Sequence, residues 1–395
     1  MKFIQRELAA QIQAAAKSFP AVVLTGPRRS GKTHLLRQMM PEASYHLLEE
    51  PDTVARYRAD PKGFLDAVKL PVILDEIQNA PDMFNYIRAR IDLKGKKRAE
   101  WFITGSQEAP LMQNVTESMA GRAAMFQLLP VSARESAKVS LLHGGFPEVL
   151  ANPKQARLWF SSYLQTYLER DVRAITAVQD LSTFRRFLTL IATRTGQLLN
   201  KSDLAGPLGM SVPGIAKWLS ILEMTQQILI VPPYFENFGK RLTKSPKVFI
   251  TDSGLACHLL GIDTTAELEK SPFLGHLFEG FVAAELVKAQ VNSGRRKEIY
   301  CFRDEQGLEV DFIVPGKGGS VRMVEAKATR TPMPQMAAPM LKLKKALEAR
   351  RSVKTPVECL LVHRQPKTRH ESTALAPGVK AVGWEDFVRD LIKPA

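Results

Sequence analysis

The stretch that decides the fold is residues 26 to 33, Gly-Pro-Arg-Arg-Ser-Gly-Lys-Thr, which comes just after the apolar residues 21 to 24. Its spacing, G-x-x-x-x-G-K-[ST], is that of a phosphate-binding loop. A strand should lead into a turn whose backbone N–H groups cradle phosphates, and the next helix adds the positive end of its dipole. The glycines would allow close approach of the backbone. Lys32 would reach the β- and γ-phosphates and act in catalysis, and Thr33 would bind Mg²⁺. The predicted nucleotide contacts are Gly26, Pro27, Arg28, Arg29, Ser30, Gly31, Lys32 and Thr33.

A second motif is an apolar strand that ends in two carboxylates. Residues 71 to 76 read Pro-Val-Ile-Leu-Asp-Glu, which is the Walker B pattern. Asp75 would hold Mg²⁺ through water, and Glu76 would orient and polarise the attacking water. A glutamate in the second position favours hydrolysis of ATP over binding alone.

A third strand-like run, residues 101 to 107, reads Trp-Phe-Ile-Thr-Gly-Ser-Gln. In AAA+ enzymes a strand of this kind lies between the first two and carries a sensor for the γ-phosphate, a role that Thr104 or Ser106 would take here. Arg122 follows, and it is a candidate arginine finger acting on a neighbouring subunit of a homo-oligomer. The alternative for Arg122 is a surface arginine at the end of a helix.

The charge balance of the chain is basic. Its 395 residues include 55 Lys and Arg against 40 Asp and Glu, a formal net charge of +15. This excess favours DNA as a partner, because each phosphate that a protein neutralises releases counterions. A single basic cluster is more often a solvated surface than a binding site. One such cluster consists of Lys240, Arg241, Lys244 and Lys247.

The composition also indicates a multi-domain cytoplasmic protein without a membrane partner. No apolar run in the sequence approaches the ~18 residues that a transmembrane helix needs. Residues 1 to 17 lack the continuous apolar stretch of a signal peptide. The three cysteines are far apart and form no C-x-x-C pair. A disulfide framework or a zinc site is therefore not expected.

The alternation of strand and helix patterns predicts three domains. Residues 1 to 145 should form an α/β P-loop ATPase domain of the AAA+ type, followed by a helical connector and winged helix in residues 146 to 255. Residues 256 to 395 should form a second α/β domain. The strands of the first domain, which should be parallel, are expected at 21–25, 44–48, 71–75, 101–105 and 125–129.

The winged helix is predicted from the residues around two short helices. Ser202 is a plausible N-cap of the first helix and Gly209 lies at a tight turn. Ser211 should cap the second helix, which covers residues 212 to 223. Lys217 and Trp218 fall outside the apolar face of that helix.

Two strands, at 228–231 and 247–250, would complete the winged helix. Such a module binds DNA by placing its second helix in the major groove. It can equally be a lid or a protein-contact module, so the pattern leaves both functions open.

The C-terminal elements are in the order of the PD-(D/E)XK nuclease fold. An amphipathic helix should start at residue 278. Strands are then expected at 299–302, 308–314 and 321–327, with a helix near 335–350 and a strand at 357–362. The alternative is a surface β-hairpin with scattered charges.

Four residues of this region form a candidate nuclease site. Asp311 lies on one strand, and Glu325 and Lys327 lie on the next, where alternation places both on the same side. Asp311 and Glu325 would share a divalent metal ion, and Lys327 would position or activate water and stabilise the charged phosphorane. Glu279 would complete the site from the helix. Many domains of this fold are binding modules without activity.

The order of these motifs resembles a widespread prokaryotic family of AAA+-type ATPases with a C-terminal domain of unassigned function. The matching segments, between about residues 5 and 365, are GPRRSGKT, VILDEIQNAP, FITGSQ, GGFPEVL, YLERDV, NKSDLAGPLGMS, KRLTKSPKVFITDSGLACHLLG, FEGFVAAEL and EVDFIV…VEAKAT. The resemblance implies an ATP-binding domain, a winged helix and a PD-(D/E)XK-like domain in a bacterial or archaeal cytoplasm. The segment before Gly144 is shorter than is usual in the family.

Two functions of different classes fit these features. In the first, a machine that hydrolyses ATP with Mg²⁺ moves its winged helix on DNA, while the C-terminal site cuts or grips the DNA. In the second, the protein is a nucleotide-dependent regulatory switch whose C-terminal modules bind a protein partner. The complete set of Asp311, Glu325 and Lys327 favours the first.

Overall fold

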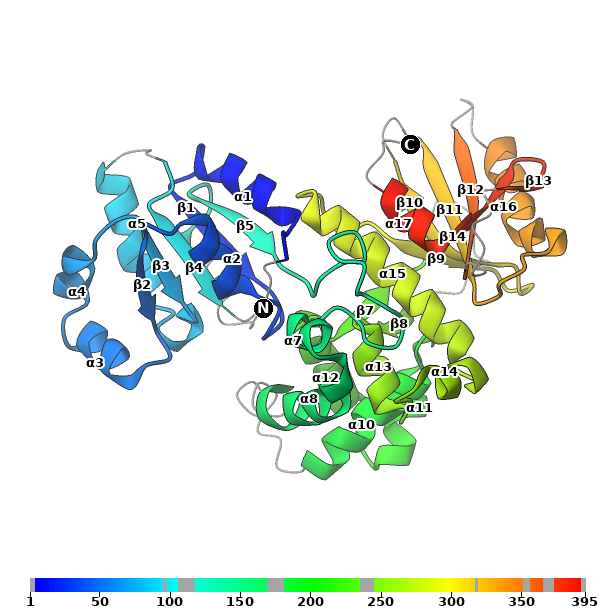
Figure 1. The fold of residues 1–395 in the computed structure, drawn as a ribbon, viewed down its shortest axis with the longest axis horizontal. Coiled ribbons are helices and arrows are strands. Elements are labelled where there is room, and N and C mark those ends of the chain that lie inside the picture. Colours follow the sequence, from blue (N-terminus) through cyan, green and yellow to red (C-terminus); the bar gives the residue numbers. More distant parts are fainter. Residues whose placement is uncertain are drawn as a thin grey trace.

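The computed structural model describes residues 4–94, 98–105, 118–168, 181–234, 245–316, 319–350, 356–364 and 373–391. In these ranges the chain forms three sheets, of five, three and six strands. Figure 1 shows the first sheet with its helices in blue and cyan, a mainly helical part in green, and the last sheet in orange and red. Ser106 and the basic residues Lys240, Arg241 and Lys244 lie outside the described ranges.

The first sheet is parallel throughout, as predicted. Its strand order is β2-β3-β4-β1-β5. The last strand begins two residues earlier than the sequence suggested, because Ala123 pairs with Ala21 at the start of β1. The strands are β1 (Ala21–Thr25), β2 (Ser44–Leu47), β3 (Val72–Asp75), β4 (Trp101–Gly105) and β5 (Ala123–Gln127).

Helices cover both faces of this sheet, so its central strands are buried on both sides, as is usual for parallel sheets. Val22 and Leu24 pack on one face with α1 (Leu8–Ala16) and α2 (Lys32–Met39). Val23 packs on the other face. That face is covered by α3 (Pro51–Ala59), α4 (Pro61–Ala67) and α5 (Met83–Lys94).

The middle part contains the two short helices that the sequence predicted, α11 (Lys201–Leu208) and α12 (Val212–Met224). An antiparallel sheet in the order β6-β8-β7 accompanies them. Its strands are β6 (Gln197–Leu198), β7 (Ile228–Val231) and β8 (Lys247–Ile250). We call α11, α12 and β6 to β8 the helix–turn–helix unit. The helices around it are α7 (Pro147–Ala151), α8 (Ala156–Tyr163), α10 (Leu181–Thr193), α13 (Ser253–Leu259) and α14 (Thr265–Lys270).

Two details of this unit differ from the prediction. The N-cap of α11 is Asn200, whose side chain accepts a hydrogen bond from the Ser202 backbone N–H at 3.0 Å, so Ser202 is not the cap. Trp218 is buried rather than on an outer face, because α10 covers a second side of α12. Its ring lies 5.3 Å from that of Phe184 and 5.2 Å from that of Phe187. Ser211 caps α12, as predicted.

The C-terminal part has the predicted order of helix, three strands, helix and strand, and then adds a hairpin and a helix. The sheet order is β13-β14-β12-β11-β10-β9, with β9, β10 and β11 antiparallel and β11, β12 and β14 parallel. The elements are α15 (Leu274–Asn292), β9 (Tyr300–Arg303), β10 (Glu309–Pro315), β11 (Val321–Lys327), α16 (Ala338–Arg350), β12 (Val357–His363), β13 (Thr373–Ala376), β14 (Val379–Gly383) and α17 (Trp384–Asp390).

Helix α15 is buried on every side, so the expectation of an amphipathic helix was wrong. All of its residues from Leu277 to Asn292 are buried. The helix contacts α1 and β5 of the first part, α13 and α14 of the middle part, and β11 and α17 of the last part. Figure 1 shows it in yellow between the two large sheets. Its polar side chains are therefore buried in contacts with other parts of the chain.

Among the described residues, no helix has both the length and the apolar character that crossing a membrane requires.

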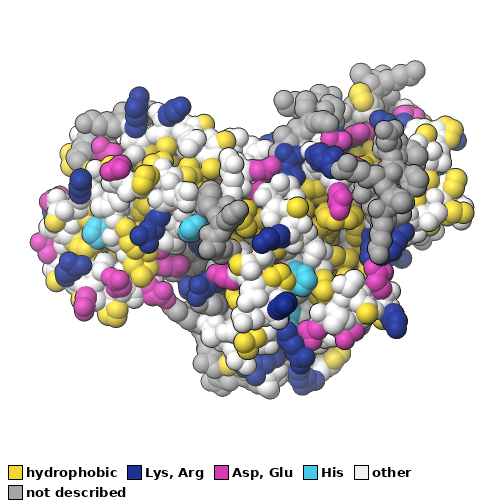
Figure 2. All heavy atoms as spheres, in the orientation of Figure 1, with side chains coloured by type: hydrophobic (Ala, Val, Ile, Leu, Met, Phe, Trp, Pro, Cys, Tyr) yellow, Lys and Arg dark blue, Asp and Glu magenta, His cyan; other side chains and the backbone are white. Residues whose placement is uncertain are grey.

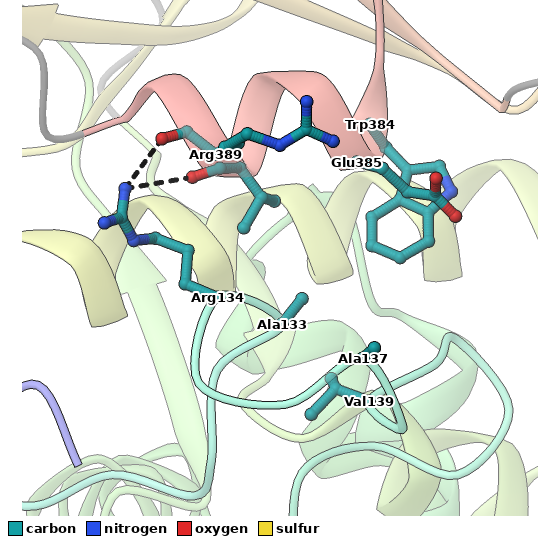
Figure 3. A pocket seen from close by; sticks show the side chains of 8 residues that line it. Ala133, Arg134, Ala137, Val139, Trp384, Glu385 and Arg389 are labelled. Carbon is teal, nitrogen blue, oxygen red and sulfur yellow. Dashed lines mark hydrogen bonds between the residues drawn. The ribbon is translucent and has the colours of Figure 1, made fainter. Parts of the chain in front are cut away.

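The segment that leaves the first sheet, residues 128–146 between β5 and α7, also contacts the C-terminal helix. The Arg134 guanidinium donates to the Arg389 carbonyl oxygen at 2.8 Å and to the Val388 carbonyl oxygen at 3.5 Å, at the end of α17 (Figure 3). A cation in this position complements the negative end of the helix dipole. A pocket of about 330 Å³ opens between this segment and α17, with Trp384 at one end.

The Glu285 carboxylate of α15 is a buried link to the same segment. It accepts hydrogen bonds from Lys288 Nζ and from the Ala133 backbone N–H, both at 2.9 Å. Removing one partner of a buried ion pair leaves the other charge uncompensated. We expect Glu285→Ala to lower the free energy of unfolding by about 3–5 kcal/mol in urea denaturation followed by tryptophan fluorescence. The exposed Glu298 provides a matched control, and equal unfolding midpoints for Glu285→Ala and Glu298→Ala would contradict this account.

Candidate functional site

The phosphate-binding sequence forms a loop between β1 and α2. Gly26 and Gly31 have φ angles of 143° and 95°, a region that side chains disfavour. A Cβ atom on Gly26 would also overlap the carbonyl oxygen of Leu128. Lys32 Nζ donates to the carbonyl oxygens of Gly26 and Pro27, both at 3.0 Å. The ammonium group therefore points back into the loop, toward the space that the loop encloses.

Asp75 is the centre of a group of hydroxyl contacts at the carboxyl edge of the sheet. Thr33 Oγ1 lies 2.8 Å and 3.0 Å from the two Asp75 oxygens, and the Tyr45 hydroxyl donates to Oδ2 at 2.7 Å. The Thr104 hydroxyl is also hydrogen-bonded to Asp75. Burial and the bond to Asp75 raise the pKa of Tyr45, so its hydroxyl stays protonated and donates. The three strands are parallel and β4 lies between β1 and β3. Thr33, Asp75 and Thr104 therefore meet at the carboxyl edge of the sheet.

Glu76 follows Asp75 with a left-handed backbone, at φ 59°. This conformation is uncommon outside glycine and costs about 1 kcal/mol. The Glu76 backbone N–H donates to Thr104 Oγ1 at 3.3 Å. Its carboxylate is paired with Arg28 at 3.5 Å and hydrogen-bonded to Gln78. The phosphate-binding loop and the second acidic residue of the Walker B motif are thus in direct contact.

Arg122 lies at the opposite edge of the sheet from the loop. Its carbonyl oxygen accepts from the N–H of Ala21, the first residue of β1. Its guanidinium is paired with both oxygens of Asp92, at 2.6 Å and 3.0 Å. The fold does not bring Arg122 together with its own chain's loop, and an action on a neighbouring subunit stays a prediction.

Arg6 contacts the loop, although no motif pointed to it. This buried residue donates to the Ser30 carbonyl oxygen at 2.9 Å and to the Leu129 carbonyl oxygen at 2.7 Å. Its Nε donates to the Glu135 carboxylate at 3.0 Å. Arg6 thus links the loop, the end of the sheet and the next segment. The contact joins residues that are distant in sequence, so only the tertiary fold reveals it.

A pocket of about 230 Å³ lies beside the loop. Ile4, Leu35 and Val131 give it apolar walls, and Glu148 lies at its edge. Burial raises the pKa of Glu148. One Glu148 oxygen is paired with Arg29 at 3.6 Å, and the other, Oε2, is buried and has no hydrogen-bond partner among the described residues. The pocket thus offers apolar surface and a carboxylate oxygen next to the phosphate-binding loop.

The carboxylates of the predicted nuclease site also lie close together, on one side of the six-stranded sheet. Asp311 Oδ2 accepts from the Ala326 backbone N–H at 3.0 Å, and Glu325 Oε2 accepts from the Asp311 backbone N–H at 3.4 Å. Lys327 is paired with Glu325 at 2.7 Å. Burial and the nearby Asp311 carboxylate raise the pKa of Glu325 to about 8. The structure therefore brings together Glu279, Asp311, Glu325 and Lys327.

Lys247 of β8 enters this cluster from the helix–turn–helix unit. Its Nζ lies 2.7 Å from Glu279, 2.6 Å from Glu309 and 3.3 Å from Asp311. Burial lowers the pKa of Lys247, but the three carboxylates outweigh burial and raise it, so the ammonium is charged. The sequence placed Lys247 in a basic surface cluster. This was wrong, because its side chain is only 3% exposed.

Comparison with known proteins agrees with a nucleotide site at the phosphate-binding loop. Residues 18–137 match an AAA domain, so the chain is an ATP-binding ATPase of the AAA family. Residues 134–266 and 274–373 match two domains of unknown function, DUF8612 and DUF4143.

The chain belongs to the same family as two mycobacterial proteins, "Uncharacterized protein Rv2008c" of Mycobacterium tuberculosis and "Uncharacterized protein Mb2031c" of Mycobacterium bovis. Each is 33% identical over 337 residues, which are 83% of this chain and 75% of the relative. The Walker-type ATPase PABY2304 of Pyrococcus abyssi is similar at 17% identity and a TM-score of 0.42, over 65% of this chain and 96% of that one.

Thr104 joins Asp75 to the backbone of Glu76, so its hydroxyl should matter more for hydrolysis than for binding. The variant Thr104→Val keeps the shape and removes the hydrogen bonds. A hydrogen bond to a charged group contributes about 1.5–3 kcal/mol. We therefore expect ATP turnover, measured by phosphate release, to fall by roughly tenfold or more while nucleotide affinity stays within about threefold. A wild-type rate in Thr104→Val would contradict this role.

Proposed function

We propose that the protein hydrolyses ATP with Mg²⁺ and uses the cycle to act on DNA through its helix–turn–helix unit. The observation that carries the ATPase part is the meeting of Lys32, Thr33, Asp75 and Glu76 at one edge of the parallel sheet. The DNA part is supported by the order of elements and the net charge of +15.

Each residue at the phosphate-binding loop would have a separate role in ATP hydrolysis. Lys32 would exchange the carbonyl oxygens of Gly26 and Pro27 for phosphate oxygens. Thr33 and Asp75 would hold Mg²⁺, which neutralises charge that develops on the phosphates. Glu76 would orient the attacking water. Arg28 contacts Glu76, so a movement of the loop on binding phosphate reaches the group that positions water.

The pocket beside the loop is the proposed site of the adenine base. Its apolar walls suit the faces of a base, and its position follows from the loop that holds the phosphates. Glu148 Oε2, which has no partner in the part of the chain that the structure describes, would accept a hydrogen bond from an amino group of the base.

The DNA-binding surface would be the outer face of α12, where Lys217 is exposed. This face corresponds to the recognition helix of a winged helix. On the face of the molecule in Figure 2, basic side chains are interspersed with acidic ones.

The C-terminal part, which we propose to be a PD-(D/E)XK-like domain, would grip the DNA or stabilise the unit that does. A second candidate function is a nucleotide-dependent switch that binds a protein partner. The burial of Lys247 favours this second function, because it removes one cation from the surface that would meet phosphates.

An action of Arg122 on a neighbouring molecule would require a homo-oligomer, which we also propose. We propose that the protein acts in the cytoplasm.

Replacing Glu76 separates hydrolysis from binding. In Glu76→Gln the group that polarises water is lost, and general-base catalysis contributes about 10²–10⁴-fold. We expect phosphate release to fall by at least about 100-fold, while a fluorescent ATP analogue binds as to the wild type. The matched variant Lys32→Ala should lose binding itself. Turnover by Glu76→Gln at the wild-type rate would show that another group activates the water.

The DNA proposal is tested by fluorescence anisotropy with a labelled duplex. Affinity should fall at least about tenfold between roughly 50 and 200 mM salt, because phosphate contacts release counterions. Lys217→Ala should weaken binding and reduce the salt slope by about 1. Lys380, exposed on β14, provides a control that should change neither. Absence of binding, or binding that does not respond to salt, would favour the protein-binding switch.

A further inference from the structure

We propose that Lys247 is the resident cation of the C-terminal carboxylate site and takes the place that a divalent metal ion would have in a PD-(D/E)XK nuclease. In this arrangement the site does not bind metal. It fastens the helix–turn–helix unit to the C-terminal sheet. The inference does not depend on whether the protein binds DNA or ATP.

The first support is the position of the ammonium group. Lys247 Nζ lies within 3.3 Å of an oxygen on each of Glu279, Glu309 and Asp311, which come from α15 and β10. Lys247, Glu279 and Asp311 are buried, whereas the Glu309 side chain is 31% exposed. A cation beside three carboxylates balances their negative charge as a metal ion would, and here that cation belongs to the chain.

The second support is that the carboxylate oxygens already have partners. Asp311 divides its oxygens between Lys247 and the Ala326 N–H, and Glu325 divides its oxygens between Lys327 and the Asp311 N–H. Glu309 accepts from Lys247 and from Arg303 at 3.2 Å. Among the described residues, no group of three or more His, Cys, Asp or Glu residues is arranged to hold a metal ion. The residues present therefore do not fit a metal while Lys247 is in place.

The third support is that Lys247 belongs to a larger contact between two parts of the chain. The Phe249 ring, also on β8, lies 5.8 Å from that of Phe312 on β10. Beyond β7, the Tyr234 N–H donates to the Cys301 carbonyl oxygen at 2.8 Å, and the Cys301 N–H donates to the Pro232 carbonyl oxygen at 2.9 Å. The chain is thus attached to the C-terminal part both just after β7, at Pro232 and Tyr234, and at the start of β8, at Lys247. Lys247 provides the charged attachment.

Metal binding by the nucleotide-free protein tests the first half of the proposal. Mn²⁺ is titrated into wild type and Asp311→Asn, and free Mn²⁺ is read by electron paramagnetic resonance. Asp75 is intact in both proteins, so any ion bound at the first site is common to the two titrations. We expect the two curves to coincide. A bound Mn²⁺ in the wild type that Asp311→Asn removes would overturn the proposal.

Thermal unfolding tests the attachment with a double-mutant cycle. Lys247→Met leaves buried carboxylates without their cation and should lower the melting temperature by about 5 to 10 °C. The surface variant Lys380→Met is the matched control and should melt with the wild type. Adding Glu279→Gln to Lys247→Met should recover at least about half of the loss, because one uncompensated charge is removed.

Two results of this cycle would contradict the proposal. One is a melting temperature of Lys247→Met equal to that of Lys380→Met, and the other is simple addition of the losses from Lys247→Met and Glu279→Gln. If Lys247→Met does not fold, the double variant decides. Recovery of soluble, folded protein supports the charge pairing, and no recovery contradicts it.

Discussion

A helix that is buried all round must find a partner inside the protein for each charge it carries, and this constraint on α15 organises the chain. Glu279 pairs with Lys247 of the helix–turn–helix unit. Glu285 and Lys288 bond to the backbone of the segment that leaves the first sheet, at Ala133 and Val131. Each charge is thus a point where another part of the chain is attached. An unpaired charge at any of these points would be costly, which fixes how the parts pack.

The same segment also leads back to the nucleotide site. Glu135 accepts hydrogen bonds from Arg6, which contacts the loop at Ser30, and from Asn292 at the end of α15. Contacts therefore run without interruption from the phosphate-binding loop through Arg6 and Glu135 to α15. At the other end of that helix, Glu279 holds Lys247. Through this path, phosphate binding would reach the helix–turn–helix unit.

The sequence predicted local structure well and long-range partners poorly, for a physical reason. Strands appear within two residues of their predicted positions, because apolar runs bounded by polar turns are a local signal. The meeting of Thr33 and Asp75 follows from two motifs that both end at the carboxyl edge of one sheet. By contrast, Arg6, Tyr45 and Lys247 contact residues far away in the sequence, and no motif predicted those contacts. The burial of α15 was missed because its periodicity does not show how many other elements pack on it.

In the proposed cycle, nucleotide binding is coupled to the helix–turn–helix unit. The most direct test is the affinity for a labelled DNA duplex at fixed salt, with and without a saturating non-hydrolysable ATP analogue. Coupling predicts affinities that differ by about fivefold or more, since typical coupling free energies are about 1–3 kcal/mol. Equal affinities in the two conditions would contradict this coupling and leave the ATPase part and the helix–turn–helix unit as independent modules.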